Sequence, residues 1–397
     1  MALSIRNLDA HAGPIGHMTE TSSIHGILHV VDSLERGGLE RVVLDLALAQ
    51  KAAGAEPRVF CLYRTGAFAE ELVRAGIVVT CGRKRDGIDL RALWRLRRAI
   101  WNRCDVVHAH NLVPNYYAAL CLRTVWRAPV LVGTCHDMGT RLSDRHLRRM
   151  FLWSVRHTRR FAMVADAVHQ SYVNGGLIPA QRADVIFNGI PLDRYPFGPA
   201  AKASARARLG LPQDALVIGA VGRLVPLKNH LSLLRALPAL LSSHPSLRLV
   251  LIGGGELETA LKAFAAQQRI QDRVVFAGER SDVGALLAGF DVFAQPSTTE
   301  GMSIALLEAS AAALAIIATR VGGNPRIVQP EGGVLVPASD DAALCRALDE
   351  LLSDAARRSK LGEAARRWVS AHASLEAMRD AYVTLYQSAR LAGGVHA

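Results

Sequence analysis

The chain has 397 residues, a length that suits two domains better than one. Half of the residues are hydrophobic and 21% are charged, so ordinary buried cores can form and a wholly disordered chain is excluded. The formal net charge is +12, and residues 81–160 alone account for it with 17 Lys and Arg against 5 Asp and Glu, which indicates an anionic partner.

Residues 1–23 lack the apolar core of a signal peptide, and we expect a disordered tail there. From Ile24 onward, short apolar runs alternate with longer helix-like segments, a pattern typical of a mostly parallel sheet covered by helices. The expected strands of this first unit are Ile27–Val31, Arg58–Tyr63, Ile77–Thr80, Val106–His108, Val130–Gly133, Phe161–Ala165 and Asp184–Ile186. The longest window without charged residues, 106–122, contains histidine, asparagine and proline, so we expect no membrane-spanning helix. The six cysteines show no Cys-x-x-Cys spacing, which favours a reduced, cytoplasmic protein without a zinc site.

A break in the pattern at Asn188–Pro199, rich in proline and glycine, predicts an interdomain linker. The alternation then restarts, with expected strands at Leu216–Val221, Arg248–Ile252, Arg273–Phe276, Asp291–Ala294 and Ala315–Ala318. We therefore predict an α/β protein with two doubly wound, Rossmann-like domains, residues 24–188 and 189–373. Such domains bind ligands beyond the carboxyl ends of their strands, so the loops that follow the strands are where chemistry is expected.

The strongest motif lies in residues 297–308. Glu300 follows a strand and precedes a helix, and Glu308 lies about two turns into that helix. Carboxylates accept paired hydrogen bonds from vicinal hydroxyls, and the backbone N–H groups just after Glu300 can receive phosphate or sugar oxygens. A sugar nucleotide offers both kinds of group. The alternative is that Glu300 caps the helix and Glu308 is a solvated helix residue, which is the commoner situation for an arbitrary pair of glutamates.

Two further motifs follow other strands of the second unit. Arg223 and Lys228 stand five positions apart on one loop, and both can converge on a pyrophosphate. Taken alone, two such cations are more often ordinary surface residues. Gly253 belongs to a run of three glycines after a strand, which lets the backbone approach a ligand or turns the chain tightly.

In this order and spacing, the motifs resemble those of the retaining glycosyltransferases of family four, which have the GT-B fold with two Rossmann-like domains facing a central cleft. The resemblance covers about residues 24–390, and its opening part, residues 29–40, looks most like exopolysaccharide-associated members. It is carried by Gly222-Arg223 with Lys228, by Gly253, by Phe276-Ala277-Gly278, by the pair Glu300 and Glu308, and by Val321-Gly322-Gly323-Asn324-Pro325. We also expect a C-terminal helix over about residues 374–392 that packs back on the first domain.

The resemblance implies that Arg223 and Lys228 bind the diphosphate of the donor. It implies that Glu300 contacts hydroxyls of the transferred sugar and that Glu308 contacts the ribose. The other donor contacts that it implies are the backbone N–H groups of Gly301, Met302, Ser303 and Ile304, the segment from Gly278 to Arg280 beside the base, and the Gly37-Gly38 loop facing the donor phosphate.

His136 matches the catalytic-site histidine of the family, close to the donor sugar and the acceptor. Judged without the resemblance, a partly buried histidine satisfied by the backbone is the more frequent situation. His108 and His110 follow another strand in the same manner, and we expect one of the two to line the acceptor cleft. His108 points to the opposite face of the strand from Val107, which favours a structural role for it.

Four positions depart from the family's pattern. Ala313 and Ala315 stand where glycine and proline are usual, which we expect to alter local packing alone. Arg320 and Arg326 stand where acidic residues are common, so the periphery of the donor side departs from the family.

Two basic segments with aromatic side chains, residues 91–101 and 144–161, are expected to form helices within the basic stretch 81–160. Such helices can rest on an anionic membrane, here the inner face of the cell membrane. The alternative is that both are solvated faces of helices whose apolar sides cover the sheet.

These features predict transfer of a hexosyl unit from a UDP- or GDP-sugar to a glycan or lipid-linked acceptor with retention at the anomeric carbon, in exopolysaccharide or cell-envelope polysaccharide synthesis. The chain has no Asp-x-Asp metal motif, so no metal and no cofactor are expected. A GT-B sugar-nucleotide epimerase and a non-catalytic nucleotide-sugar-binding protein are the alternatives. No helix-turn-helix, zinc-finger or ribonucleoprotein motif supports a nucleic-acid partner.

Overall fold

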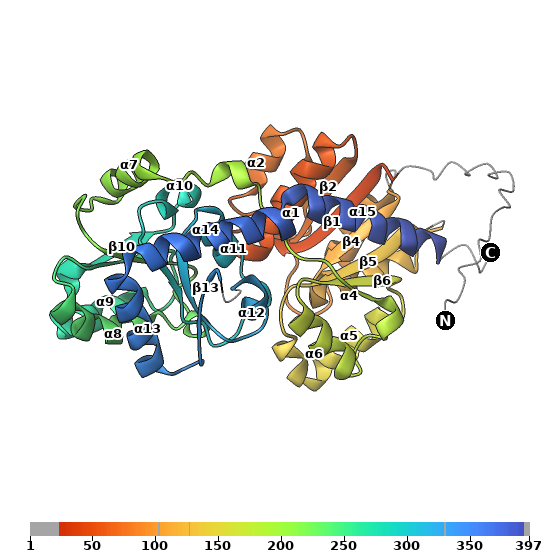
Figure 1. Ribbon diagram of the computed structural model, residues 1–397. Coiled ribbons are helices and arrows are strands. Elements are labelled where there is room, and N and C mark those ends of the chain that lie inside the picture. The colour runs from red at the N-terminus through yellow and green to blue at the C-terminus, as the bar shows by residue number, and fades with distance from the viewer. Residues whose placement is uncertain (1–23, 102–103, 127, 329–330, 393–397) are drawn as a thin grey trace, which may run out of the picture.

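The computed structural model describes residues 24–101, 104–126, 128–328 and 331–392. The tail expected at residues 1–23 lies outside this part. Two parallel sheets, each flanked by helices, stand side by side along the molecule (Figure 1). This arrangement confirms the prediction of two Rossmann-like α/β units.

The first sheet has seven parallel strands in the order β3-β2-β1-β4-β5-β6-β7. Their bounds are β1 Gly26–Ser33, β2 Glu56–Arg64, β3 Val78–Cys81, β4 Val106–His110, β5 Val130–Cys135, β6 Arg160–Met163 and β7 Ala183–Val185. The order reverses between β1 and β4, which are hydrogen-bonded neighbours. A ligand crevice is expected at such a reversal.

The second sheet has six strands in the order β10-β9-β8-β11-β12-β13, with its reversal between β8 and β11. The strands are β8 Val217–Val221, β9 Arg248–Ile252, β10 Val274–Gly278, β11 Val292–Gln295, β12 Ala315–Thr319 and β13 Gly333–Val336. The edge strand β13 was not among the expected strands. It pairs with β12 through four residues, the first of which is Gly333.

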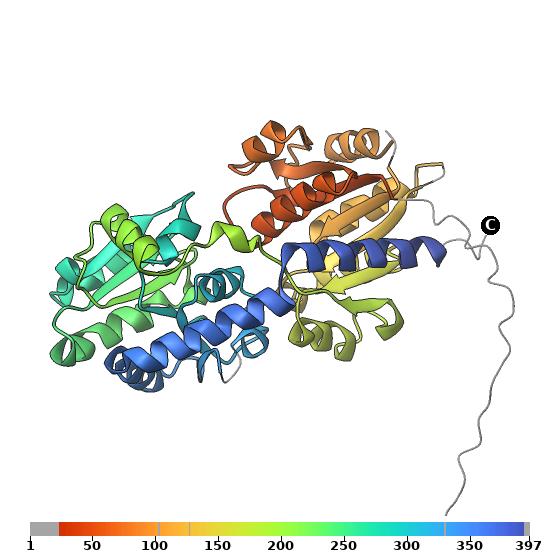
Figure 2. The same cartoon turned by 45° about the horizontal axis from the view of Figure 1, so that its top comes forward.

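Helices cover both faces of each sheet. In the first unit they are α1 Gly38–Ala52, α2 Ala69–Arg74, α3 Leu90–Trp101, α4 Leu112–Leu122, α5 Arg145–Val155 and α6 Asp166–Asn174. In the second they are α7 Pro199–Leu209, α8 His230–Ser243, α9 Glu258–Gln267, α10 Val283–Leu287, α11 Ile304–Ala311, α12 Asn324–Ile327, α13 Asp341–Ser353 and α14 Ala355–His372. The last helix, α15 Leu375–Leu391, lies beside α1 and β5 of the first unit (Figure 2).

Alternating residues of the strands in the first unit face opposite sides of the sheet. Leu28, Val30 and Val107 face one side of the sheet and pack with residues of α3 and α4. The residues between them, including His29 and His108, face the other side, where α15 lies. Polar histidines therefore occupy a face that a helix covers.

The chain crosses between the two units twice, and the two crossings touch. Ile190 N donates to the carbonyl of Ala373, and Ile190 pairs with Ser374 in an isolated bridge. A Cβ on Gly189 would overlap the carbonyl of Ser374. The close packing at Gly189 therefore requires a residue without a side chain.

The second basic segment is not one helix from Asp144 to Phe161. Asp144 caps α5 by accepting from the N–H groups of His146 and Leu147, and the helix ends at Val155. Arg160 instead begins β6, where its guanidinium donates to Asp184 at 2.9 Å.

Candidate functional site

The carboxyl ends of the two sheets face one another across the junction of the two units. Gly301, which follows β11, lies so close to His136, which follows β5, that a Cβ on Gly301 would overlap the His136 carbonyl oxygen. Gly38 at the start of α1 is similarly near Ile304 at the start of α11, with 3.4 Å from its ideal Cβ position to Ile304 Cγ1. The structure thus brings the predicted Gly37-Gly38 loop and His136 together with the start of α11.

Glu300 and Lys228 form an ion pair at this junction. Lys228 Nζ lies 2.6 Å from Glu300 Oε1, which also accepts from Gln295 Nε2 at 2.8 Å. The Glu300 side chain is 9% exposed and that of Lys228 is 24% exposed, so the pair is largely withdrawn from water. Among the described residues, the hydrogen bonds of the Glu300 carboxylate are to the side chains of Lys228 and Gln295, not to N–H groups of α11, so Glu300 does not cap this helix.

Ser303 is the actual cap of α11. Its hydroxyl accepts from Leu306 N at 3.3 Å and donates to Gln295 Oε1 at 2.8 Å. Gln295, which the sequence analysis missed, therefore connects the capping serine to Glu300. Met302 is buried, and its sulfur accepts from the N–H of Asn188 in the linker.

The loops after β8, β9 and β10 meet through glycines. A Cβ on Gly253 would overlap the carbonyl of Gly222, and Gly253 N donates to the carbonyl of Gly278 at 2.8 Å. Gly253 has φ +135° and Gly278 has φ +65°, values that favour glycine. Arg223 follows Gly222 and is exposed, with its charge acting on Glu40 of the first unit.

Arg280, expected beside the base, is engaged within its own loop. Its guanidinium donates to both carboxylate oxygens of Asp282, at 2.7 and 2.8 Å. This bidentate contact holds the pKa of Asp282 below its ordinary value. A ligand there would meet a paired guanidinium.

Glu308 lies on α11, and its side chain faces Tyr195 of the linker and Arg41 of α1. Tyr195 donates its hydroxyl hydrogen to Glu308 Oε1 at 2.9 Å. Burial raises the pKa of Glu308 to about 7, and the nearby charge of Arg41 opposes that rise. Arg41 in turn pairs with buried Asp45, which also accepts from Arg194 of the linker at 2.7 Å. Tyr195 was missed because its partner is 113 residues away in the chain.

His136 ends a chain of hydrogen-bonded histidines. Its Nε2 lies 3.0 Å from His110 Nδ1, and its backbone N–H donates to Asn111 Oδ1. His110 Nε2 lies 3.1 Å from His29 Nδ1. His108 and His110 are 0% and 1% exposed, so the expectation that one of them lines the acceptor cleft is wrong. Both side chains project from β4 to the face that α15 covers.

The ring nitrogens of His29, His108 and His110 offer three atoms within 4.8 Å of one another, a spacing that could attract a metal ion. Every nitrogen of these three rings already has a hydrogen-bonding partner within the protein. Within the described residues, this buried cluster therefore needs no ion to satisfy it.

Asp32 is a further candidate that the sequence analysis did not single out. It lies at the end of β1, and its Oδ1 is buried without a hydrogen-bonding partner among the described residues. Burial raises its pKa to about 6, against the opposing charges of Arg141 and Lys84. The rule that ligands bind beyond strand ends could have found it.

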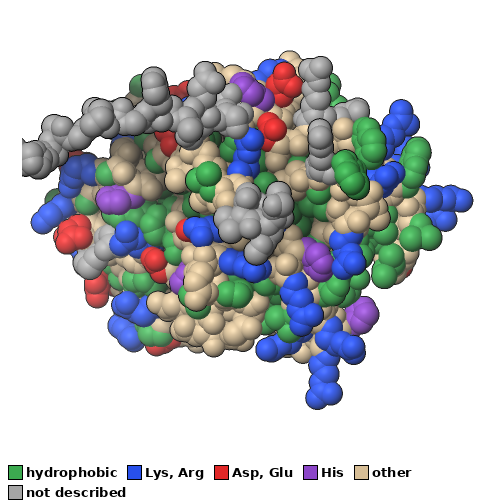
Figure 3. All heavy atoms as spheres, turned by 90° about the vertical axis from the view of Figure 1, so that its right-hand side faces the viewer, with side chains coloured by type: hydrophobic (Ala, Val, Ile, Leu, Met, Phe, Trp, Pro, Cys, Tyr) green, Lys and Arg blue, Asp and Glu red, His purple; other side chains and the backbone are tan. Residues whose placement is uncertain are grey.

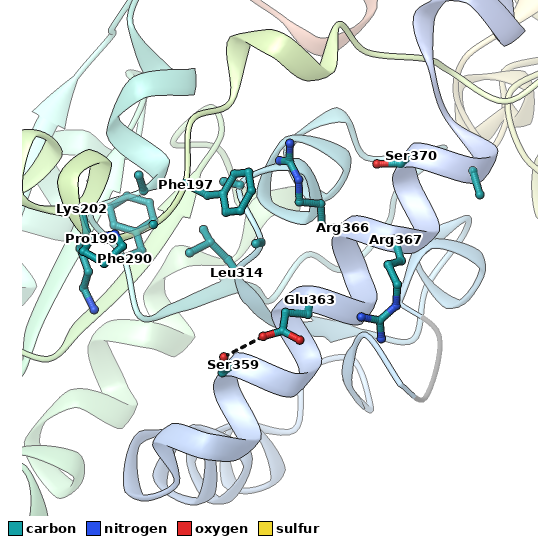
Figure 4. A pocket seen from close by; sticks show the side chains of 15 residues that line it. Phe197, Pro199, Lys202, Phe290, Leu314, Ser359, Glu363, Arg366, Arg367 and Ser370 are labelled. Atoms are coloured by element: carbon teal, nitrogen blue, oxygen red, sulfur yellow. Dashed lines mark hydrogen bonds between the residues drawn. The ribbon is translucent and has the colours of Figure 1, made fainter.

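A separate pocket of about 980 Å³ lies on the second unit, between the linker and α14 (Figure 4). Phe197, Leu314 and Arg366 line it, with the Arg366 guanidinium stacked 4.0 Å from the Phe197 ring centroid. None of the predicted site residues lines this pocket.

The basic stretch 81–160 forms part of the surface of the first unit. Figure 3 faces the end of the molecule that this unit forms, where Lys and Arg side chains project beside hydrophobic ones. On α3, Trp94 and Trp101 are 60% and 61% exposed, and Arg98 and Arg97 lie over their rings. No helix among the described residues is long and apolar enough to span a membrane.

Comparison with known proteins gives the family of this chain. Residues 36–194 match the family model described as Glycosyltransferase Family 4, and residues 201–368 match that described as Glycosyl transferases group 1. The chain is 31% identical to the glycosyltransferase EpsF of Bacillus subtilis over 315 residues, which are 75% of this chain and 79% of EpsF.

A second relative is a GDP-mannose-dependent monoacylated alpha-(1-6)-phosphatidylinositol monomannoside mannosyltransferase of Corynebacterium glutamicum. It is 35% identical over 211 residues, which are 51% of this chain and 55% of the relative. The chain spans about half the length of this protein and of two related enzymes that it also matches.

The fold is shared with Alr3699/HepE of Anabaena, solved in complex with UDP-glucose. The TM-score is 0.81 at 20% sequence identity, over 92% of this chain and all of that one. Both family models, the extensive match to EpsF and the two facing Rossmann-like units agree: the chain belongs to glycosyltransferase family 4 and has the GT-B fold.

Proposed function

We propose that this protein is a retaining hexosyltransferase that uses a nucleoside diphosphate sugar and a glycan or lipid-linked acceptor. The observation that carries the proposal is the Lys228–Glu300 ion pair at 2.6 Å, positioned where Gly301 meets the backbone of His136. A cation and a largely buried carboxylate thus lie at the ends of both sheets, next to the backbone of His136 from the opposite unit. A donor held by the second unit would present its sugar to this point.

In the proposed reaction, the bond from the anomeric carbon to the diphosphate oxygen breaks, and a bond to the acceptor oxygen forms on the same face of the sugar. The acceptor's hydroxyl proton passes to the departing phosphate oxygen. The products are the glycosylated acceptor and a nucleoside diphosphate. This balance requires no oxidant or second nucleophile, and we propose that it requires no metal ion.

Charge develops on the leaving diphosphate and, with opposite sign, on the sugar ring. Arg223, Lys228 and the first N–H groups of α11 would stabilise the diphosphate, an electrostatic effect worth about 3–4 kcal/mol per preorganised donor in well-studied enzymes. Glu300 would accept from sugar hydroxyls and support the positive ring. Both roles draw on charges that are already oriented in the protein.

Glu308 would receive the ribose. Its Oε1 accepts from Tyr195, whereas Oε2 has no hydrogen-bonding partner in the part of the chain that the structure describes. A carboxylate with one engaged oxygen and one available oxygen suits a hydroxyl donor.

The relatives support the classes of donor and acceptor. The mannosyltransferase of C. glutamicum is named for GDP-mannose and for an acceptor built on phosphatidylinositol, and Alr3699/HepE was solved with UDP-glucose. The opening segment 29–40, which resembles exopolysaccharide-associated members of the family, supports a role in exopolysaccharide or cell-envelope polysaccharide synthesis. We propose a UDP- or GDP-hexose donor on this basis.

Peripheral attachment to the inner face of the cell membrane completes the proposal. The exposed Trp94 and Trp101 with their neighbouring arginines combine apolar area with positive charge, the pair of features that interfacial helices use. A lipid-linked acceptor would then be presented at the surface where the enzyme is bound.

Calorimetric titration with UDP and GDP tests the donor site. Lys228→Ala removes a largely buried charge and should weaken binding of the preferred nucleotide by roughly 1.5–3 kcal/mol. Arg235→Ala is the matched control, because Arg235 is exposed and pairs with Asp341. Equal affinity of the Lys228 variant and wild type would refute the assignment. A protein that binds nucleotide but transfers no sugar would be a non-catalytic binding protein instead.

A further inference from the structure

We propose that Gln50 is a positioning residue that decides which ring nitrogen of His136 carries the proton, acting through His29 and His110. The proposal rests on the proposed function for the catalytic placement of His136, while the hydrogen-bond chain itself is independent of it. Gln50 lies on α1, is 1% exposed and, among the described residues, makes its side-chain hydrogen bonds to His29 and Tyr386 and to no predicted site residue.

The Gln50 amide determines which atom donates at each step of the chain of hydrogen bonds. Gln50 Nε2 donates to the Tyr386 hydroxyl at 3.2 Å, and Gln50 Oε1 lies 2.8 Å from His29 Nε2. Because an amide oxygen only accepts, His29 must carry its hydrogen on Nε2. The Nδ1 atom of neutral His29 is then a lone-pair acceptor.

Each later link has one consistent donor. His110 Nε2 lies 3.1 Å from the His29 Nδ1 lone pair, so His110 donates there and keeps Nδ1 as an acceptor. His136 Nε2 lies 3.0 Å from that acceptor and must donate to it. His136 Nδ1 is left unprotonated, and it has no hydrogen-bonding partner among the described residues.

The four imidazole rings are neutral, so the hydrogen bonds between them all run in the same donor-to-acceptor direction. Burial lowers the pKa of His29 to about 4 and that of His136 to about 3, and it lowers those of His108 and His110 well below the ordinary value. A neutral imidazole has one donor and one acceptor, so fixing one ring fixes the next. Protonation of a ring would break this order.

Helix α15 supplies the second hydrogen-bonding partner of the Gln50 amide. The Tyr386 hydroxyl accepts from Gln50 and lies 2.8 Å from His108 Nδ1, to which it donates. His108 Nε2 then donates to Thr134 Oγ1 at 2.6 Å. A rotated amide would reverse both branches and place the His136 proton on Nδ1. Gln50, the partner of Tyr386, thus determines the tautomer of a ring that it does not hydrogen-bond.

The consequence for substrate recognition is specific. His136 is partly exposed, whereas His29 and His110 are buried, so His136 is the member of the chain that a ligand can reach. With an unprotonated Nδ1 it accepts a hydrogen bond from a hydroxyl of donor or acceptor. It does not supply a proton to the leaving group.

Nitrogen-15 NMR of histidine-labelled protein reads the protonation of each ring nitrogen directly, without any sugar. The His136 signals are assigned by their loss in His136→Gln. We expect His136 of the wild type to carry hydrogen on Nε2 with Nδ1 free. Hydrogen on Nδ1 in the wild type overturns the proposal, as does stoichiometric zinc in the purified protein.

Three variants separate positioning from simple packing. Gln50→Leu should shift His136 toward a mixture of both tautomers, whereas Gln50→Glu should preserve the wild-type tautomer because its carboxylate accepts from His29 Nε2. Tyr382→Phe is the matched control on α15, since Tyr382 contacts Thr134 and not Gln50. An unchanged tautomer in folded Gln50→Leu, or a changed one in Tyr382→Phe, contradicts the proposal.

Steady-state kinetics of the Gln50 variants test whether the His136 tautomer affects sugar transfer. Gln50→Leu should lower kcat by about tenfold or more while leaving nucleotide affinity unchanged, and Gln50→Glu should restore most of kcat. Equal loss in both Gln50 variants would indicate a packing defect and reject the positioning role. If the NMR result holds and no sugar is transferred, the proposed function fails while the tautomer assignment stands.

Discussion

Glu300 accepts two hydrogen bonds through one oxygen, from Lys228 and from Gln295, and this arrangement aims its carboxylate at the junction of the two units. Glu300→Gln keeps the shape and removes the charge that would support a positive sugar ring. We expect transfer to be nearly abolished while the melting temperature stays close to that of wild type. Turnover above about half of the wild-type value, a loss below roughly 0.4 kcal/mol, would contradict the assignment.

The control for this variant is another close Lys–Glu pair outside the junction. Lys262 Nζ lies 2.6 Å from Glu258 Oε1 on α9, and the two side chains are 52% and 35% exposed. Glu258→Gln should therefore leave turnover unchanged, which separates the position of Glu300 from the general effect of removing one carboxylate.

Ala313 offers a stability prediction. It follows α11 with φ +58°, a left-handed conformation that glycine adopts without strain and that alanine adopts at a cost. Ala313→Gly should raise the free energy of unfolding by about 0.5–1 kcal/mol, measured by urea denaturation. The neighbouring Ala312 has φ −79°, so Ala312→Gly should lower it by a similar amount. Destabilisation by both changes would show that Ala313 is not strained.

The sequence predicted the positions of the main site residues better than their partners. Glu300, Lys228 and His136 could be found because motif spacing places them after strands, and the structure brings them to one junction. Tyr195 and Gln50 could not be found, because each acts through a contact with a residue more than 100 positions away. Such contacts depend on how whole elements pack.

At the scale of elements, hydrophobic alternation predicted the seven strands of the first sheet and five of the six in the second. The missed strand, β13, has four residues and lies at the edge, where a short apolar run after glycines resembles a loop. The end of α5 was also misplaced, because a run of basic and aromatic residues continues past Val155 into β6. Periodicity does not mark that boundary.

The buried histidines between β1, β4 and α15 make the free energy of unfolding depend on pH. Burial lowers the pKa of His29 from 6.5 to about 4, so the unfolded chain binds a proton there between these values and the folded protein does not. This residue therefore contributes a loss of stability as the pH falls from about 6.5 to 4. Buried carboxyls act in the opposite direction, since burial raises the pKa of Asp32 and Asp45 to about 6.

A difference measurement isolates the histidine from these opposing groups. Relative to His29→Gln, the wild type should lose up to about 1.4 kcal/mol per pH unit below pH 6.5, whereas the difference should be constant above pH 7.5. Urea unfolding at a series of pH values measures it. A difference independent of pH from 5 to 8 would show that His29 titrates alike in the folded and unfolded protein.

At the scale of the whole molecule, the basic surface formed by residues 81–160 of the first unit is the proposed site of membrane attachment. Arg148, Arg149 and Arg159 are exposed there, whereas Arg160 pairs with Asp184 and is left unchanged. Changing the three exposed arginines to serine should weaken binding to phosphatidylglycerol vesicles by about 3 kcal/mol at low ionic strength if all three face the lipid. Co-sedimentation with vesicles measures the effect.

The matched control removes the same charge from the other unit. Arg235, Arg346 and Arg357 are exposed on α8, α13 and α14, and their replacement by serine should leave vesicle binding unchanged. Equal effects of the two triple variants would mean that net charge alone drives binding. Wild-type protein that ignores anionic vesicles would reject the membrane proposal.

The central claim is that the two facing units transfer a hexosyl group from a nucleoside diphosphate sugar with retention. Time-resolved proton NMR of the reaction with UDP-glucose or GDP-mannose, whichever nucleotide the calorimetry favours, and a lipid-linked glycan acceptor tests it most directly. The account predicts a glycosidic product whose anomeric configuration equals that of the donor, together with stoichiometric nucleoside diphosphate. A product of inverted configuration would contradict it, as would a nucleotide sugar epimerised without transfer.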